Sequence, residues 1–199
     1  SFVTLNKAQK IAGCVLANIG SETISLVVFE NNIPISLEVF PIGSTDITND
    51  IALGLRIPLE EAESIKLGGI TQTTFPKKKL DEIIQARLSD MFELIETHLK
   101  KIGKNSLLPA GIIITGGGSS IGTIEDFAKA SLKLPSRIAH INIPEKEKGK
   151  VKDAFFAVAL GLCILGMSEE DGNASGSIVI KTPRNILNKV KSLLHPFLP

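Results

Sequence analysis

Ile-Ile-Ile-Thr-Gly-Gly-Gly-Ser-Ser, residues 112 to 120, is the stretch of sequence that decides how this chain folds. The run of β-branched residues predicts a short buried strand, and the strand ends at three consecutive glycines. Residues 121–133 then follow a helical pattern. Glycines at a strand-to-helix corner let backbone N–H groups approach a flat or anionic ligand, because no Cβ atom stands in the way. The stretch is therefore a candidate floor for a nucleotide site, although a tight turn without a ligand fits it equally well.

The composition is that of an ordinary globular chain. The 199 residues are 43% hydrophobic and carry a formal net charge of +1, so charge gives no reason to expect a nucleic-acid partner. Cys14 and Cys163 lie in apolar runs, which indicates buried reduced thiols rather than a disulfide or a metal site. The histidines are scattered, so we expect no metal centre. The apolar run 154–167 is too short to cross a bilayer, and we expect no transmembrane anchor.

Hydrophobic periodicity and turn residues predict an α/β fold with a mixed sheet. Asn31-Asn32 tolerates positive φ and predicts a hairpin turn. The apolar helix near the end of this series is expected to be buried on most sides. In chain order the pattern predicts strands at 13–19, 24–30 and 33–39, helices at 44–55, 59–67 and 80–102, the strand beginning at 112, a helix at 121–133, a strand at 137–143 and a helix at 153–167.

The composition changes after residue 167. Residues 168–181 predict a flexible linker, and residues 182–199 predict an amphipathic helix. The expected apolar stripe is formed by Ile186, Leu187, Val190, Leu193, Leu194 and Phe197. Arg184, Lys189 and Lys191 lie on the other side and would face an anionic membrane surface. Docking of this helix on its own domain or on a protein partner is the alternative.

The turn between the first two strands has the residues of a phosphate loop. Asn18-Ile19-Gly20-Ser21-Glu22-Thr23 contains small and hydroxyl side chains, which leave backbone N–H groups free to meet phosphate oxygens. With the glycine run 116–118 about a hundred residues later, this loop resembles the second lobe of actin-like ATPases. Further segments resemble, more specifically, the FtsA family of bacterial actin-like cell division proteins: 41–43, 47–55, 58–66, 84–87, 115–119 and 157–162.

The resemblance implies an actin-like ATPase lobe of the ribonuclease H-like type, with a smaller inserted subdomain. Subdomain IIA would comprise residues 1–55 and 106–167, and subdomain IIB residues 56–105. Arg87 matches a family arginine associated with the tail of the tubulin-like partner. The implied nucleotide-binding residues are Gly20, Ser21 and Thr23 at the phosphates, Glu63 and Lys66 at the ribose or adenine, and Gly116, Gly117, Gly118 and Ser119 under the base and sugar. A turn glycine, a strand-end hydroxyl or a surface ion pair is the simpler role for each of them.

The implied function is a scaffold at the inner face of the cytoplasmic membrane. Such a protein tethers the ring of FtsZ, the tubulin-like division protein, to an anionic membrane surface, and self-associates into filaments. The complete protein would bind ATP with magnesium. Here Asn18 stands where the family usually has Asp, Ser21-Glu22 replaces glycines, and the first lobe is absent, so we do not expect this chain to hydrolyse ATP. The alternatives are an active actin-like ATPase or phosphotransferase, and an actin-like pilus-assembly adaptor.

Overall fold

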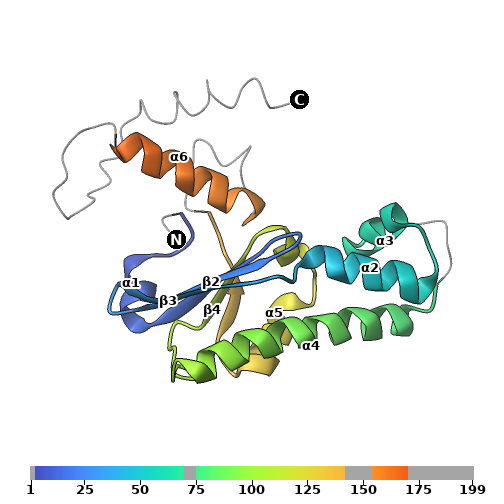
Figure 1. The fold of residues 1–199 in the computed structure, drawn as a ribbon, viewed down its shortest axis with the longest axis horizontal. Helices are drawn as coiled ribbons and strands as arrows, with labels where there is room; N and C mark the ends of the chain where they lie inside the picture. Colours follow the sequence, from blue (N-terminus) through green and yellow to red (C-terminus); the bar gives the residue numbers. More distant parts are fainter. Residues whose placement is uncertain (1–2, 70–74, 142–153, 170–199) are drawn as a thin grey trace. The chain divides into compact units, whose positions relative to one another are not determined.

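A computed structural model describes residues 3–69, 75–141 and 154–169 (Figure 1). The chain divides into two compact units, Ser1–Ala157 and Val158–Pro199, and each is described by itself. In chain order the elements are α1 Lys7–Ala12, β1 Cys14–Ile19, β2 Ile24–Glu30, β3 Ile33–Phe40, α2 Ser44–Leu55, α3 Leu59–Lys66, α4 Lys77–Lys101, β4 Ile112–Thr115, the 3-10 turn η1 Gly117–Ser120, α5 Ile124–Leu132, β5 Ser136–Ile138, the 3-10 turn η3 Ala154–Phe156 and α6 Ala157–Glu169.

The first unit is built on one mixed sheet, which confirms the predicted α/β class. The strands lie in the order β3-β2-β1-β4-β5. The β1–β2 and β2–β3 pairs are antiparallel, while β1–β4 and β4–β5 are parallel. Asn18 pairs with Thr115 at the end of the β1–β4 register. The loops that follow β1 and β4 therefore leave the sheet side by side.

One face of the sheet forms the main core with the helices. Side chains of β1, β2 and β4 that point to this face pack against α2, α4 and α5. The apolar residues of α4 recur at helical spacing, so the helix turns one stripe to the core; the buried members are Leu80, Leu88, Met91, Phe92, Ile95 and Leu99. In Figure 1, α4 runs below α2 and crosses α5, and it packs against both helices. The long helix thus supports both the sheet and the segment that carries α2 and α3.

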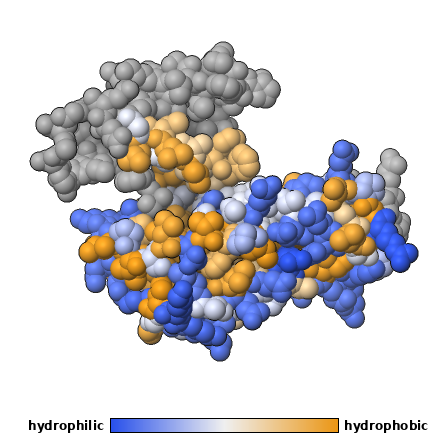
Figure 2. Space-filling model, in the orientation of Figure 1, coloured by the Kyte–Doolittle hydropathy of each residue, from blue (hydrophilic) through white to orange (hydrophobic). Residues whose placement is uncertain are grey.

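The edge strand β3 leaves apolar side chains in solvent. Ile33, Ile35, Leu37 and Val39 alternate along the strand and are all exposed, and Leu37 reaches 71%. Ser36, Glu38 and Phe40 are partly buried, and His98 of α4 contacts the Ser36 hydroxyl at 2.9 Å. Figure 2 shows apolar side chains interspersed with hydrophilic ones on the visible face. The side chains of a strand point alternately to the two faces of its sheet, so every second residue of β3 is exposed on the face that points away from α4.

Several predicted boundaries were wrong. The helix expected from residue 80 already begins at Lys77, and β5 is shorter than the predicted strand. The helix expected from residue 121 begins at Ile124, because the 3-10 turn η1 comes first. The short helix α1 was not predicted, although Asn6 and Gln9 form a reciprocal capping box at its start.

The apolar segment near residue 154 also differs from its prediction. Its first residues form η3, and α6 then continues to Glu169, so residues 168 and 169 of the expected linker are helical. The rest of the predicted linker and the whole predicted tail helix, residues 170–199, lie outside the described residues. Among the helices that are described, none has the length and apolar character needed to span a membrane.

Candidate functional site

The loop Gly20–Thr23 is seated on the beginning of α2. The Gly20 N–H donates to the Thr23 carbonyl at 2.8 Å, which closes the turn between β1 and β2. The carbonyls of Gly20 and Ser21 accept from the N–H groups of Ser44 and Thr45 at 2.9 and 2.8 Å. These are two of the four N–H groups that a helix leaves without an internal partner at its start. The loop is therefore held by backbone hydrogen bonds, while the side chains of residues 21–23 are exposed.

A glycine allows this close approach between loop and helix. A Cβ atom at Gly43 would overlap the backbone of Ser21. The Gly43 N–H itself donates to the Asp46 carboxylate at 2.8 Å, so the start of α2 is occupied by groups of the protein. A phosphate at this end of the sheet would consequently meet the N–H groups of the loop rather than those of the helix.

The turn after β4 lies directly against the end of β1. Gly116 has a φ of +89°, and a Cβ there would overlap the Ile19 carbonyl and the Asn18 side chain. A Cβ at Gly118 would strike the Ile19 side chain. The Thr115 hydroxyl and the Gly116 N–H both donate to the Ala154 carbonyl, at 2.8 and 3.2 Å. The glycine turn is thus fixed between β1 and the residues that lead into α6.

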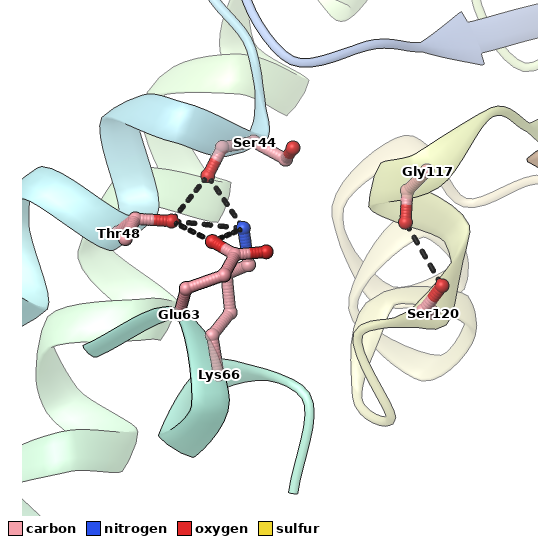
Figure 3. A network of polar contacts seen from close by, with 6 residues as sticks. All are labelled: Ser44, Thr48, Glu63, Lys66, Gly117 and Ser120. Atoms are coloured by element: carbon pink, nitrogen blue, oxygen red, sulfur yellow. Dashed lines mark hydrogen bonds and ion pairs between the residues drawn. The ribbon is translucent and has the colours of Figure 1, made fainter. Parts of the chain in front are cut away.

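Glu63 and Lys66 of α3 turn back toward α2 (Figure 3). The Lys66 ammonium lies 2.6 Å from Glu63 Oε2 and donates to the Thr48 hydroxyl at 2.8 Å and to the Ser44 carbonyl at 3.1 Å. The Thr48 hydroxyl in turn donates to Glu63 Oε2 at 2.5 Å. These contacts join the first turns of α2 to the last turns of α3, and through Ser44 they reach the loop Gly20–Thr23.

The two charged groups of this network differ in their access to solvent. The Lys66 side chain is 4% exposed and the Glu63 side chain 46%. Partial burial raises the pKa of the Glu63 carboxyl, but hydrogen bonds from Lys66 and Thr48 and the positive charge of Lys66 lower it by more, so the pKa lies below its ordinary value. Glu63 is consequently ionised at neutral pH and can still be reached from outside.

Arg87 lies apart from these residues, in an ion pair between α4 and α2. Its Nε and Nη2 donate to the two oxygens of Asp50 at 2.6 and 3.0 Å, and Asp90 lies 3.4 Å from Nη1. Hydrogen bonding to Asp50 raises the pKa of Arg87 further, against a smaller effect of burial. The arginine that the sequence offers to a partner is therefore engaged within the chain.

The predicted nucleotide residues thus form one connected region. The loop residues Gly20, Ser21 and Thr23 and the turn Gly116–Ser119 leave the carboxyl ends of neighbouring parallel strands, where α/β sheets bind ligands. Sequence reasoning missed Gly43, Ser44 and Thr48, which hold the region together, and Asp50, which binds Arg87. Of these, the Ser44–Thr48 pair at helical spacing was a usable signal, whereas the partner of Arg87 lies 37 residues away.

These residues offer a ligand bare backbone and one exposed carboxylate. The glycines bring bare backbone to the site, and Glu63 offers a carboxylate to hydroxyl donors. Against this, Glu22 adds negative charge to the loop, and the nearby Lys66 is already paired. Across the three described ranges, no group of three or more His, Cys, Asp and Glu side chains is arranged to hold a metal ion.

Solved structures with this fold are actin-like proteins. The chain resembles a PilM–PilN type IV pilus biogenesis complex, with a TM-score of 0.66, 22% identity, and 80% of this chain and 47% of that chain covered. It also resembles MreB5 of Spiroplasma citri bound to ADP, with a TM-score of 0.63, 15% identity, and 84% and 62% covered. The archaeal actin homolog Ta0583 gives a TM-score of 0.57 at 19% identity, with 80% and 50% covered. The fold is thus an actin-like α/β fold.

Sequence relatives identify the family. The cell division protein FtsA of Pseudomonas aeruginosa is 27% identical over 202 residues, which cover 89% of this chain and 48% of that protein. FtsA of Bacillus subtilis is 30% identical over 159 residues, covering 69% of this chain and 36% of that protein. The chain therefore spans about half of the relative from P. aeruginosa, and less of the one from B. subtilis. A family model described as cell division protein FtsA matches residues 15–161, and the chain belongs to the FtsA family of cell division proteins.

Proposed function

We propose that this chain is the second lobe of an FtsA-type scaffold that tethers the FtsZ ring to the inner face of the cytoplasmic membrane. The observation that carries the proposal is the family match over residues 15–161, followed in the same chain by an amphipathic sequence at 182–199. A folded domain joined to a lipid-binding segment has the two parts that a tether needs. The proposed localisation is peripheral, on the cytoplasmic side.

The membrane contact is assigned to residues 182–199. Their sequence places six large apolar side chains on one side of a helix and Arg184, Lys189 and Lys191 on the other. A helix of this length is only marginally stable alone in water, so it needs a surface that covers its apolar side. Each cation near an anionic leaflet adds about 1 kcal/mol of attraction, which salt screens.

The FtsZ contact is assigned to the surface of α4 around Arg87. A guanidinium that already binds one carboxylate through two parallel hydrogen bonds presents the geometry that suits another. An acidic segment of FtsZ would therefore exchange with Asp50 for the Arg87 side chain. This contact is the proposed role of Arg87.

The proposed nucleotide is a structural or regulatory ligand, bound between Gly20–Thr23, Gly116–Ser119 and Glu63. ADP bound to MreB5, which has a similar fold, supports this choice of ligand class. Asn18 and Glu22 weaken the case for a magnesium ion at the phosphates, as argued above. We therefore assign ATP to the complete protein, where it would favour self-association into filaments, and assign no hydrolysis to this chain.

Co-sedimentation with vesicles tests the tether directly. The full chain and a chain ending at Ser177 would each be mixed with phosphatidylglycerol vesicles and with phosphatidylcholine vesicles, at low and high salt. We expect only the full chain to sediment, and mainly with the anionic vesicles at low salt. Purified FtsZ added to the same mixtures should sediment only where the full chain does.

Equal recovery of both chains in the supernatant would contradict the membrane assignment and favour docking of the tail on a protein surface. If the full chain sediments while the added FtsZ stays in the supernatant, the membrane contact is supported and the FtsZ contact is rejected. ATP turnover by a version that contains both lobes, lost on a change at Thr23 or Gly117, would instead support the enzymatic alternative.

A further inference from the structure

The edge strand β3 has one side of its backbone open to a further strand. It is the last strand of the sheet on its side, and its one neighbour is β2. Within the described residues, only β2 forms hydrogen bonds to the backbone of Ile33–Phe40. Because N–H and C=O groups point alternately to the two sides of a strand, about half of those in β3 remain available for pairing with another chain.

Polar contacts with α4 fix which face of β3 points outward. His98 Nε2 lies 2.9 Å from the Ser36 hydroxyl, and His98 Nδ1 lies 3.4 Å from Glu38 Oε2. A slip of one residue would carry Ser36 and Glu38 away from His98 and would place apolar side chains there instead. The outward direction of the apolar row is therefore a fixed feature of the strand. This row consists of Ile33, Ile35, Leu37 and Val39.

The second half of β3 lacks the features that usually protect an edge strand. Such strands carry lysines, prolines or bulges, which discourage pairing with another chain. In β3 these features are confined to the first half, where Pro34 has no N–H and Ile35 is left out of the register with β2 at a bulge. In the second half the register is regular, and the outward side chains, Leu37 and Val39, are apolar. This half is open to pairing.

We propose that β3 is an interface with a second copy of this chain, in which the two β3 strands pair antiparallel about a two-fold axis at Leu37. The contact joins the two five-stranded sheets into one. A two-fold axis relates the same patch on both copies, so the assembly closes at two chains. The contact needs neither nucleotide nor membrane, and it does not depend on the function proposed above.

The side-chain pattern of β3 is complementary to itself in this register. To keep both apolar rows on one face, the axis must pass through a residue and not between two residues. An axis at Glu38 would set two carboxylates opposite each other, which is destabilising, and an axis at Ser36 would place Pro34 inside the ladder. An axis at Leu37 sets Leu37 against its own copy and Ser36 against Glu38 of the second copy. Apolar then meets apolar, and each carboxylate meets a hydroxyl residue.

Charge and size set the expected strength of the dimer. The net charge of the chain is +1, so two copies repel each other little at long range. The paired halves of β3 bury less than the roughly 800 Å² per partner that is typical of stable complexes. We therefore expect a weak dimer in equilibrium with the monomer.

Sedimentation equilibrium of the full chain, without nucleotide or lipid, is the first test. Chain concentrations from about 10 µM to about 1 mM cover weak association. We expect the fraction of dimer to rise over this range. A monomer at every concentration would overturn the proposal, and so would association that continues beyond two chains and is unchanged in Leu37→Lys.

Leu37→Lys and the matched control Leu107→Lys test the surface. The two leucines are 71% and 65% exposed, so neither change removes a core side chain. We expect Leu37→Lys to raise the dissociation constant at least about tenfold, because two ammonium groups then face each other across the axis. Leu107→Lys adds the same charge elsewhere and should leave the constant unchanged. Equal effects of the two changes would show that net charge and not β3 controls association, which would overturn the interface.

Single cysteines test the register. Leu37→Cys and Val39→Cys would each be made in a chain that carries Cys163→Ser, while Cys14 is fully buried. Opposite residues of an antiparallel pair have Cα atoms about 4.5–5.5 Å apart, a separation that a disulfide can span. With the axis at Leu37, the two copies of Val39 are four positions out of register, or about 14 Å apart.

Under mild oxidation we therefore expect a disulfide-linked dimer of Leu37→Cys and little or none of Val39→Cys. Equal cross-linking of the two variants would indicate random collision and would overturn the proposal. Cross-linking of Val39→Cys alone, or of neither variant at concentrations where the parent chain is dimeric, would overturn the axis at Leu37.

Discussion

Gly116 is the residue on which the junction of β1 and β4 depends. Its φ of +89° is strained for any residue with a side chain, and a Cβ would overlap the Ile19 carbonyl and the Asn18 side chain. We expect Gly116→Ala to lower the free energy of unfolding by roughly 2–4 kcal/mol, because strain and overlap add. Urea denaturation of the 199-residue chain would measure it.

Gly122 supplies the matched control for this change. A Cβ at Gly122 meets nothing within 4 Å, and its φ is not in the left-handed region. Gly122→Ala should therefore shift the unfolding free energy by less than about 1 kcal/mol. Equal losses in the two variants would show that the β1–β4 junction tolerates a side chain.

At the residue scale, the sequence shows which residues are unusual but not what they contact. The three glycines after Thr115 predict a close backbone approach, and the structure has one, against Ile19. Lys66 and Glu63 also stand out in the sequence as a charged pair three residues apart. That a third and a fourth group, Thr48 and Ser44, complete their network depends on how α3 packs on α2, which no local pattern encodes.

α2 is the element on which the candidate site converges, and its packing on α4 is testable. Arg87 of α4 reaches Asp50 of α2 with two hydrogen bonds, while Asp90, one turn along α4, lies 3.4 Å away and is 62% exposed. A double-mutant cycle of Arg87→Met and Asp50→Asn should give a coupling energy of about 1 kcal/mol, because the pair is bidentate and partly buried. Urea denaturation of the four chains would measure it.

The same cycle with Asp90→Asn is the comparison. An exposed pair on one helix face contributes about 0.3–0.5 kcal/mol, so the Arg87–Asp90 coupling should be the smaller of the two. Which of the two coupling energies is larger shows whether Arg87 chiefly joins α4 to α2 or chiefly stabilises α4 itself. A larger coupling energy with Asp90 than with Asp50 would contradict the role of the Arg87–Asp50 ion pair in joining α2 and α4.

Elements with a strong period were predictable, and those set by single contacts were not. The apolar stripe of α4 predicted that helix within a few residues, and alternation predicted β2 and β3. The start of α5 was missed because the hydroxyls of Ser119 and Ser120 bond back to Gly116 and Gly117, which favours a 3-10 turn first. The short helix α1 has no buried residue, so hydropathy alone could not reveal it.

At the scale of the whole molecule, the described residues account for the actin-like fold and the candidate nucleotide region, while the proposed membrane contact rests on residues 182–199. The mixed sheet was expected from the sequence, and the two loops Gly20–Thr23 and Gly116–Ser119 were expected from their glycines and hydroxyl residues together with the resemblance. The membrane role depends instead on the sequence of a tail that lies outside the described residues. A test of the whole molecule must therefore separate the apolar side of that tail from its charge.

Leu193→Glu and Ser192→Glu make this separation, because they add the same charge on opposite sides of the expected helix. In Leu193→Glu the chain loses the burial of a leucine, worth roughly 1.5–3 kcal/mol, and gains repulsion from the anionic lipid. In Ser192→Glu only the repulsion is added, at about 1 kcal/mol. We expect partitioning to phosphatidylglycerol vesicles, measured by sedimentation, to fall roughly sixtyfold or more for Leu193→Glu and about fivefold for Ser192→Glu. Equal losses would mean that charge alone holds the tail to the lipid, and binding unchanged in both variants would remove the tail from the membrane contact.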